Sequence, residues 1–534
     1  MRSTSVTMPA ETLTAARQTE RAELETRQER SLTGRASLNV VQSLLDYSVK
    51  LGVGLVIVPI LVTGLGRTLF GVWEMLGRLV GYVESADGRS TQALRLVISN
   101  QQWSDDHTAK RRWIGSALAV WICFLPLWAT AGALLIWLTP TVTRVPPEYH
   151  TTVRAACALM MGAVLLAGLG SLPESVLRGM NLGYKRMGLQ AGVSIVGGGL
   201  LAAAVYAGGG LVGVAAAGLV LAALTGLCFF ALVRRQVPWF GADRPRRAEV
   251  GSMLGMSVWL TLGDVVSKLL GSDVLVLGMV LSASSVTTYV LTGYAARLAL
   301  NLHSLSAEAV MPGVAGVLGE KSFERAALLR HELLAVTGIF VTAVGSTILL
   351  WNRSFVHLWV GAENYAGTWT NLLIVLIAVQ SAFIRCDAYL IDAALQPARR
   401  VRVGIAAGVA TLALSLAFTP WAGMVGLCLG ILLGRATQSV GYPLLVRSCL
   451  GRNAELSLTW LARPLLIMGL LFAGAAYLGQ RILVQHWLSW VSAVAVTLAL
   501  TFVIALVLGL PAGLRSAVVR RVLEMAQRLG GGRS

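Results

Sequence analysis

The chain has 534 residues, of which 55% are hydrophobic and only 13% are charged, and its mean hydropathy is +0.69. A soluble globular domain carries about twice that share of charged residues, so this class is excluded. The formal net charge of +18 follows from the membrane orientation derived below, and it requires no nucleic-acid partner.

The apolar residues are gathered in runs that match the length of a membrane span, which is about 20 residues. Ahead of them, residues 1–36 mix arginine with glutamate and are expected to form a mobile or loosely helical cytoplasmic arm. About fourteen runs follow, which predicts an all-α polytopic membrane protein. In chain order they cover residues 38–64, 69–98, 113–138, 151–179, 188–208, 211–233, 251–281, 284–316, 331–351, 367–395, 403–419, 421–446, 459–480 and 486–511.

Lysine and arginine set the predicted orientation of these spans. With both termini in the cytoplasm, the cytoplasmic segments hold about thirty basic residues. The opposite loops hold five: Arg67, Arg144, Arg154, Arg353 and Arg481. The reverse orientation would invert this bias, so we expect both termini inside the cell.

Two halves of the chain resemble each other. One segment, SLLDYSVKLGVGLVIVPIL with Asp46 and Lys50, resembles a second segment that lies 218 residues later, TLGDVVSKLLGSDVLVLGMVL with Asp264 and Lys268. Segments 205–235 and 418–447 match at an offset of 213. Matches that occur in the same order in both halves indicate duplication of the chain. Because each half contains six spans, an even number, the two halves have the same orientation in the membrane.

The expected division of the chain follows from this repeat. It consists of the arm at 1–36, an N-lobe of six spans at 37–233, a cytoplasmic linker at 234–250, a C-lobe of six spans at 251–447, two further spans at 448–512 and an amphipathic cytoplasmic tail at 513–534.

Four acid-then-base pairs lie four residues apart within spans, a spacing that places both charges on one helical face. They are Asp46/Lys50, Glu74/Arg78, Glu174/Arg178 and Asp264/Lys268. Each pair either neutralises itself within its own helix or borders a wet cavity between the lobes. The sequence leaves both interpretations open.

Other arginines within spans have no acidic residue three or four positions away: Arg95, Arg297, Arg385 and Arg435. Such an arginine must find a tertiary partner, reach the membrane surface, or face water and substrate. Arg95 lies near the cytoplasmic end, which favours the membrane surface. Arg297 and Arg385 lie deeper and suit a phosphate or pyrophosphate, because a guanidinium donates two parallel hydrogen bonds.

These charges supply the candidate site residues. The candidate cationic cavity comprises Lys50, Arg78, Arg89, Lys268, Arg297 and Arg385. Acids in the spans can partner the lone arginines or bind a proton or Na⁺, and the interpretation as partners is favoured for Asp273, Glu308, Asp387 and Asp392. The candidates for ion coupling are Asp46, Asp264, Asp273 and Asp392.

Two spans are polar enough to border a pathway. The second contains an Asp87-Gly88 pair in its polar second half, which indicates a break in the helix, and broken helices at membrane depth line cavities. The eighth carries Arg297, Asn301 and His303. No metal-ligand spacing, nucleotide-binding loop or CxxC motif is present, so we expect no cofactor, and coupling to Na⁺ or H⁺ stays open.

Three stretches carry a family resemblance: PILVTGLGRTLFGVWEMLGRLVGYVESADG (59–88), DVLVLGMVLSASSVTTYVLTGYAARL (273–298) and FVHLWVGAENYAGTW (355–369). Together with the glycines at 210–213 and 423–426 they resemble the oligosaccharide-lipid flippases of the MOP superfamily, in the polysaccharide transporter (Wzx-type) branch. The resemblance covers about residues 38–512.

That resemblance implies two six-helix bundles around a central cavity that is often cationic. It implies transport of an undecaprenyl-pyrophosphate-linked oligosaccharide from the inner to the outer leaflet of a bacterial inner membrane by alternating access. The expected product is a surface polysaccharide such as exopolysaccharide, O-antigen or capsule, and the protein itself is not expected to be an enzyme. The expected partners are the lipid-linked glycan, membrane lipids and the glycan polymerase and co-polymerase machinery, with no nucleic acid.

Three alternatives stay open. Two belong to the same superfamily: a flippase for the peptidoglycan precursor lipid II, and a cation-coupled multidrug exporter. A net basic cavity favours a flippase and a net acidic cavity favours an exporter. The third is a membrane glycosyltransferase or polymerase, which the short external loops argue against.

Overall fold

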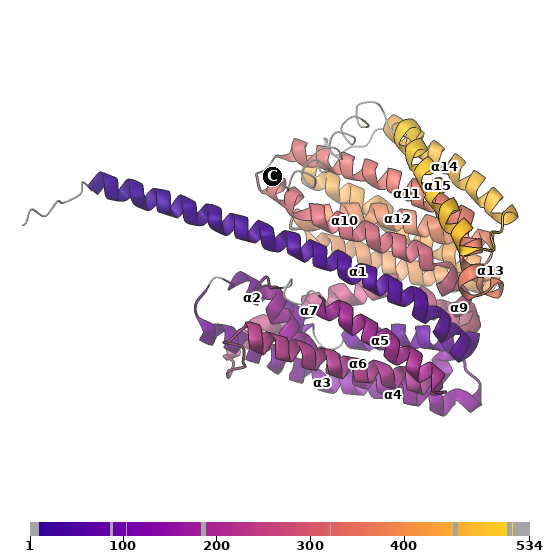
Figure 1. Ribbon diagram of the computed structural model, residues 1–534, viewed down its shortest axis with the longest axis horizontal. Coiled ribbons are helices and arrows are strands. Elements are labelled where there is room, and N and C mark those ends of the chain that lie inside the picture. The colour runs from indigo at the N-terminus through magenta and orange to yellow at the C-terminus, as the bar shows by residue number, and fades with distance from the viewer. Residues whose placement is uncertain are drawn as a thin grey trace, which may run out of the picture.

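Figure 1 shows the protein, a computed structural model, in which the described residues form a bundle of helices. The structure describes residues 10–85, 89–102, 104–182, 188–320, 322–451, 458–509 and 515. Side chains are described from residue 45 onward, apart from 305–313, 397 and 458–461. The predicted tail at 513–534 lies outside these residues except for Arg515.

The described segments contain helices and no strand. In chain order the helices are α1 (Ala10–Glu84), α2 (Ser90–Asn100), α3 (His107–Thr143), η2 (Pro147–Tyr149), α4 (His150–Gly179), α5 (Leu189–Tyr206), α6 (Gly210–Gln236), α7 (Arg247–Leu270), α8 (Asp273–Val280), α9 (Ala283–Thr292), α10 (Tyr294–Gly319), α11 (Phe323–Val360), η4 (Ala362–Asn364), α12 (Thr368–Ala393), α13 (Pro397–Leu450), α14 (Leu458–Arg481), α15 (Trp487–Ile504) and η6 (Ala505–Gly509).

Helix α1 is longer than predicted at its beginning. It starts at Ala10, so residues 10–36 of the expected arm are helical, and Figure 1 shows this part of α1 extending well beyond the other helices. Gly66 then interrupts α1 with φ 74° and ψ 167°. Before Gly66 the helix packs along α5, and after it along α8 and α9.

Helix α13 also reverses, where Ala422 and Gly423 leave the helical region. Its two halves pack closely as an antiparallel hairpin. A Cβ atom added to Gly430 would lie 2.5 Å from the Ser415 backbone nitrogen, and one added to Gly434 would lie 2.3 Å from the Thr411 Cα.

The crossings match the sequence prediction. Eleven helices in the described part are long and apolar enough to cross a membrane. The reversals in α1 and α13 each add one crossing, and α9 with α10 forms one more, which gives fourteen. The all-α polytopic fold is therefore confirmed.

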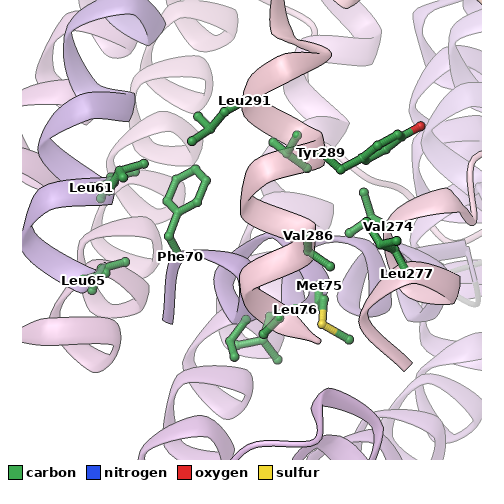
Figure 2. Close-up of a cluster of buried hydrophobic side chains, with 14 of the residues drawn as sticks. Leu61, Leu65, Phe70, Met75, Leu76, Val274, Leu277, Val286, Tyr289 and Leu291 are labelled. Atoms are coloured by element: carbon green, nitrogen blue, oxygen red, sulfur yellow. The ribbon is translucent and has the colours of Figure 1, made fainter. Parts of the chain in front are cut away.

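The helices form two groups that meet along α1 (Figure 1). Helices α1–α6 form the N-lobe, in which α4 packs on α6 and α1 on α5; helices α8–α15 form the C-lobe, in which α12 packs on α13 and α11 on α14 and α15. We call the end that carries the turn at Gly66 the kink end, and the end that carries residues 237–246 the linker end. Figure 2 shows the apolar contact of α1 with α8 and α9 near the kink end; the side chains drawn there include Leu61, Leu65, Phe70, Met75, Leu76, Val274, Leu277, Val286, Tyr289 and Leu291.

At the linker end, the segment between α6 and α7 is attached to the N-lobe. The Trp239 ring stacks on His107 at 5.8 Å and covers the Lys110 ammonium at 5.3 Å. The Arg111 guanidinium donates to the Trp239 carbonyl at 2.7 Å, and Arg112 pairs with Glu249 at 3.0 Å. The beginning of α7 is therefore held against α3.

The close packing inside α13 gives a direct test of the fold. Gly430→Ala is expected to destabilise the protein by about 1–3 kcal/mol, because the new methyl group collides with backbone that cannot move aside. A lower Tm in detergent would show this. Gly469→Ala in α14 is the matched control, since its added Cβ meets nothing within 4 Å. Equal Tm values for the two variants would contradict the hairpin.

Candidate functional site

A charged cluster forms where α1 gives way to α2. The predicted helix break is confirmed, because α1 ends at Glu84 and α2 begins at Ser90; residues 86–88 themselves lie outside the described part. Arg89 has a left-handed backbone with φ 47°. This conformation is uncommon for a residue other than glycine.

Asp264 of α7 is the centre of that cluster. Its Oδ2 atom accepts hydrogen bonds from Ser85 Oγ at 2.5 Å, Arg89 Nη2 at 2.5 Å and Lys268 Nζ at 3.0 Å. Tyr82 donates to the Lys268 carbonyl at 2.6 Å. Two candidate cavity cations and one candidate coupling acid thus join α1 and α2 to α7.

A separate polar pocket lies between α1 and α10. It has a volume of about 230 Å³, and its polar lining comes from Glu74, Tyr294, Arg297 and Asn301. The rest of its lining is apolar: Val58, Phe70, Val290, Leu291 and Leu298. One basic and one acidic side chain therefore share an otherwise largely apolar pocket.

The helix break at Gly293 orients Arg297. Because α9 ends at Thr292 and α10 begins at Tyr294, the Val290 carbonyl lies at the break, and the Arg297 guanidinium donates to it. Among the described side chains, no carboxylate lies within 4 Å of this guanidinium. Its positive charge is therefore available to a ligand in the pocket.

Polar residues continue from the pocket along one face of α10. Asn301 and Ser304 follow Arg297 at helical spacing. Arg385 of α12 donates to Ser304 Oγ, with its Nη1 atom 3.5 Å from the Leu300 carbonyl. Arg435 of α13 donates in the same manner to Ser381 Oγ and to the Leu270 carbonyl at 2.8 Å. Within the described part, neither arginine pairs with a carboxylate.

Three of the candidate acids in the C-lobe have partners in the described part. Asp387 accepts two hydrogen bonds from buried Arg330, at 2.7 and 3.0 Å. Asp392 is paired with Arg400, and Asp273 accepts from the Tyr289 hydroxyl at 3.0 Å. The sequence favoured a lone arginine as the partner of each of these acids. Asp387 and Asp392 instead pair with Arg330 and Arg400, and Asp273 is hydrogen-bonded to a tyrosine. The Glu308 side chain lies outside the described part.

Two of the four predicted pairs form within their helices. Glu174 pairs with Arg178 at 2.7 Å, and Asp264 pairs with Lys268. No such contact joins the two members of either remaining pair. Asp46 is buried while Lys50 is exposed, and Glu74 lines the pocket without an ion pair to half-buried Arg78. The predicted cavity cations therefore lie at several separate places: Arg89 and Lys268 at Asp264, Arg297 in the pocket, and Arg385 beside Ser304.

An apolar groove adjoins the pocket, and sequence reasoning missed it. Its volume is about 550 Å³, and its lining is mostly aromatic and aliphatic: Leu55, Ala295, Leu298, Val344, Thr347, Ile348, Trp351, Asn352, Phe355, Trp359, Trp487, Trp490, Val494 and Leu498. Leu298 lines both the groove and the polar pocket. The spacing of Trp351, Phe355 and Trp359, four residues apart, was the signal that could have revealed it.

Three of the four tryptophans that line the groove are held in place, because their indole N–H groups donate hydrogen bonds within the protein. Trp359 donates to the Leu55 carbonyl at 2.7 Å, Trp490 to the Trp351 carbonyl at 3.2 Å, and Trp351 to Thr497 at 2.9 Å. The faces of these rings remain to contact an apolar ligand.

Comparison with known proteins confirms the architecture. No protein-family model and no curated protein matches the chain. The lipid II flippase MurJ, in an inward closed conformation, is 11% identical with a TM-score of 0.62, over 86% of this chain and 98% of that chain. A multidrug resistance MATE family transporter of the MOP superfamily is 15% identical, with a TM-score of 0.60 in its inward-facing conformation and 0.55 in its outward-facing conformation. These two structures cover 79% of this chain, and 98% and 96% of their own. At such identities the likeness establishes the fold.

The Asp264 cluster predicts a stability effect. Asp264→Asn leaves Arg89 and Lys268 without their carboxylate, so we expect a loss of about 2–4 kcal/mol, reduced somewhat because these side chains are 15–23% exposed. Denaturation in detergent would measure it. Glu320→Gln is the control, because its pair with Arg325 is 67–72% exposed and is worth at most about 1 kcal/mol. If both variants unfold like the wild type, Asp264 does not hold α7 to the N-lobe.

Proposed function

We propose that this protein is a flippase that carries an undecaprenyl-pyrophosphate-linked oligosaccharide from the inner to the outer leaflet of a bacterial inner membrane. It works by alternating access and serves the export of a surface polysaccharide. The observation that carries the proposal is that two different sites adjoin and share Leu298 in their lining. One is a pocket whose arginine forms no ion pair with a described carboxylate, and the other is an aromatic, apolar groove. A lipid diphosphate has the same two parts.

The arginines support an anionic headgroup. A guanidinium binds phosphate oxygens through two parallel hydrogen bonds, and Arg297 and Arg385 have only carbonyl and hydroxyl oxygens as partners in the described structure. Charged hydrogen bonds contribute about 1.5–3 kcal/mol each. Such a contribution corresponds to roughly tenfold to more than a hundredfold in affinity.

The groove supports a long apolar tail, but it contributes little to affinity. Lipid tails in the bilayer are as apolar as the leucines of a protein, so moving a prenyl chain from the membrane into the groove is close to neutral. Its role is to orient the lipid, with the tail along α11 and α15 and the diphosphate at Arg297. Affinity and selectivity then come from the polar pocket.

The orientation proposed from the sequence places the linker end in the cytoplasm. Arg111, Arg112, Arg235 and Arg247 lie at that end, beside residues 237–246. Basic residues are retained on the cytoplasmic side of membrane proteins. The pocket and the groove then lie nearer the outer leaflet.

A cation-coupled multidrug exporter is the second candidate, and Glu74 favours it. A carboxylate free of ion pairs in an apolar pocket would attract a lipophilic cation. Binding of tetraphenylphosphonium that is lost in Glu74→Gln, with no binding of undecaprenyl diphosphate, would support the exporter. A lipid II flippase shares the headgroup chemistry of our first candidate, and only the glycan distinguishes the two.

Arg297 provides the test. Arg297→Ala is expected to weaken the binding of undecaprenyl diphosphate at least tenfold, because it removes a charged hydrogen-bond donor. The affinity of Arg297→Lys should fall between those of the wild type and Arg297→Ala, since lysine keeps the positive charge but cannot donate two parallel hydrogen bonds. Native mass spectrometry of the full-length protein in detergent would measure the affinities. Arg325→Ala is the control, because that side chain is 72% exposed. Wild-type affinity in both Arg297→Ala and Arg385→Ala would overturn the assignment.

A further inference from the structure

The polar pocket holds one acid that a diphosphate site does not need. Glu74 lines the pocket from α1, while Arg297 and Asn301 line it from α10. The nearest base in the sequence, Arg78, forms no ion pair with Glu74, and neither does Arg297 across the pocket. The carboxylate and the guanidinium therefore face one cavity without neutralising each other.

The size of the pocket limits what can lie between them. Its volume of about 230 Å³ exceeds the roughly 150 Å³ of an engineered cavity that binds benzene. That space suits a phosphate with the sugar ring next to it, so the further sugars of an oligosaccharide would lie outside the pocket. With the diphosphate at Arg297, the group that reaches Glu74 is the sugar attached directly to it.

The chemistry of a carboxylate determines which sugar it accepts. An ionised carboxylate only accepts hydrogen bonds, so it binds hydroxyl, amide N–H and ammonium groups. A second carboxylate placed against it in a pocket with apolar walls is repelled strongly, because the low local dielectric does not screen like charges. The negative charge of the diphosphate is offset by the Arg297 guanidinium, which lines the pocket from α10.

We infer that Glu74 is a specificity-determining residue, which admits a neutral or amino sugar next to the diphosphate and rejects a sugar that bears a carboxylate. This inference rests on the proposed flippase function. It names the substrate class at one position of the glycan, while Asn301 supplies an amide that can bond to the same sugar in either direction.

Three probes of equal prenyl length test the inference: undecaprenyl diphosphate, undecaprenyl diphosphate-glucose and undecaprenyl diphosphate-glucuronic acid. The two sugars differ only in the carboxylate at C6. Native mass spectrometry of the full-length wild-type protein in detergent is expected to show at least tenfold tighter binding of the glucose probe than of the glucuronic acid probe. Glu74→Gln, which keeps the size of the side chain, should reduce this ratio below threefold.

Glu148→Gln is the matched control, because it removes the same charge from an exposed position in η2 and should keep the wild-type ratio. A wild type that binds undecaprenyl diphosphate but does not discriminate between the sugars overturns the inference and leaves the flippase proposal standing. So does a Glu74→Gln variant with the full wild-type ratio. A wild type that binds none of the three probes overturns both. The wild-type ratio needs no variant, so misfolding of Glu74→Gln would not prevent the test.

Discussion

The positive charge of Arg297 lies inside a bundle of membrane-spanning helices without an ion pair to any described carboxylate. A buried charge costs several kcal/mol unless hydrogen bonds or water compensate for it. Here the break between α9 and α10 supplies a backbone carbonyl to one side of the guanidinium, and the pocket opens on the other. Arg385 and Arg435 follow the same pattern, with hydroxyl and carbonyl oxygens as partners. Elsewhere the protein does pair its charges, as at Arg330 and Asp387.

The lobes are joined by different physical contacts at their two ends. Near the kink end the contact of α1 with α8 and α9 is apolar and tightly packed, with Met75 and Leu277 fully buried (Figure 2). Toward the linker end, Asp264 and the segment around Trp239 hold α7 to the N-lobe by charges and a stacked ring. A motion that separates the lobes at the linker end must therefore break the Asp264 contacts or bend the chain at residues 271–272, between α7 and α8.

The fold was predictable from the sequence to a large extent, because apolar runs and basic loops depend on local composition. The fourteen runs, the reversal near residue 420 and the break after Glu84 all followed from it. The site was less predictable, since spacing along a helix shows which charges can meet and not which do. Asp264 pairs with Lys268 within α7, which is one of the two interpretations that the sequence left open, but it also binds Arg89 and Ser85 from the break between α1 and α2. Glu74 is at pairing distance in sequence from Arg78 and lines a pocket with Arg297 instead. The spacing of Trp351, Phe355 and Trp359 indicates only the α11 wall of the groove. The packing of α15 on α11, which completes the groove, follows from no local pattern in the sequence.

An experimental map of the full-length protein in nanodiscs with undecaprenyl diphosphate tests the central claim most directly. We expect diphosphate density against the Arg297 guanidinium, with prenyl density running past Leu298 along the rings of Trp351 and Trp490. Diphosphate bound elsewhere, with the Arg297 side chain locked against the Glu74 carboxylate, would contradict it.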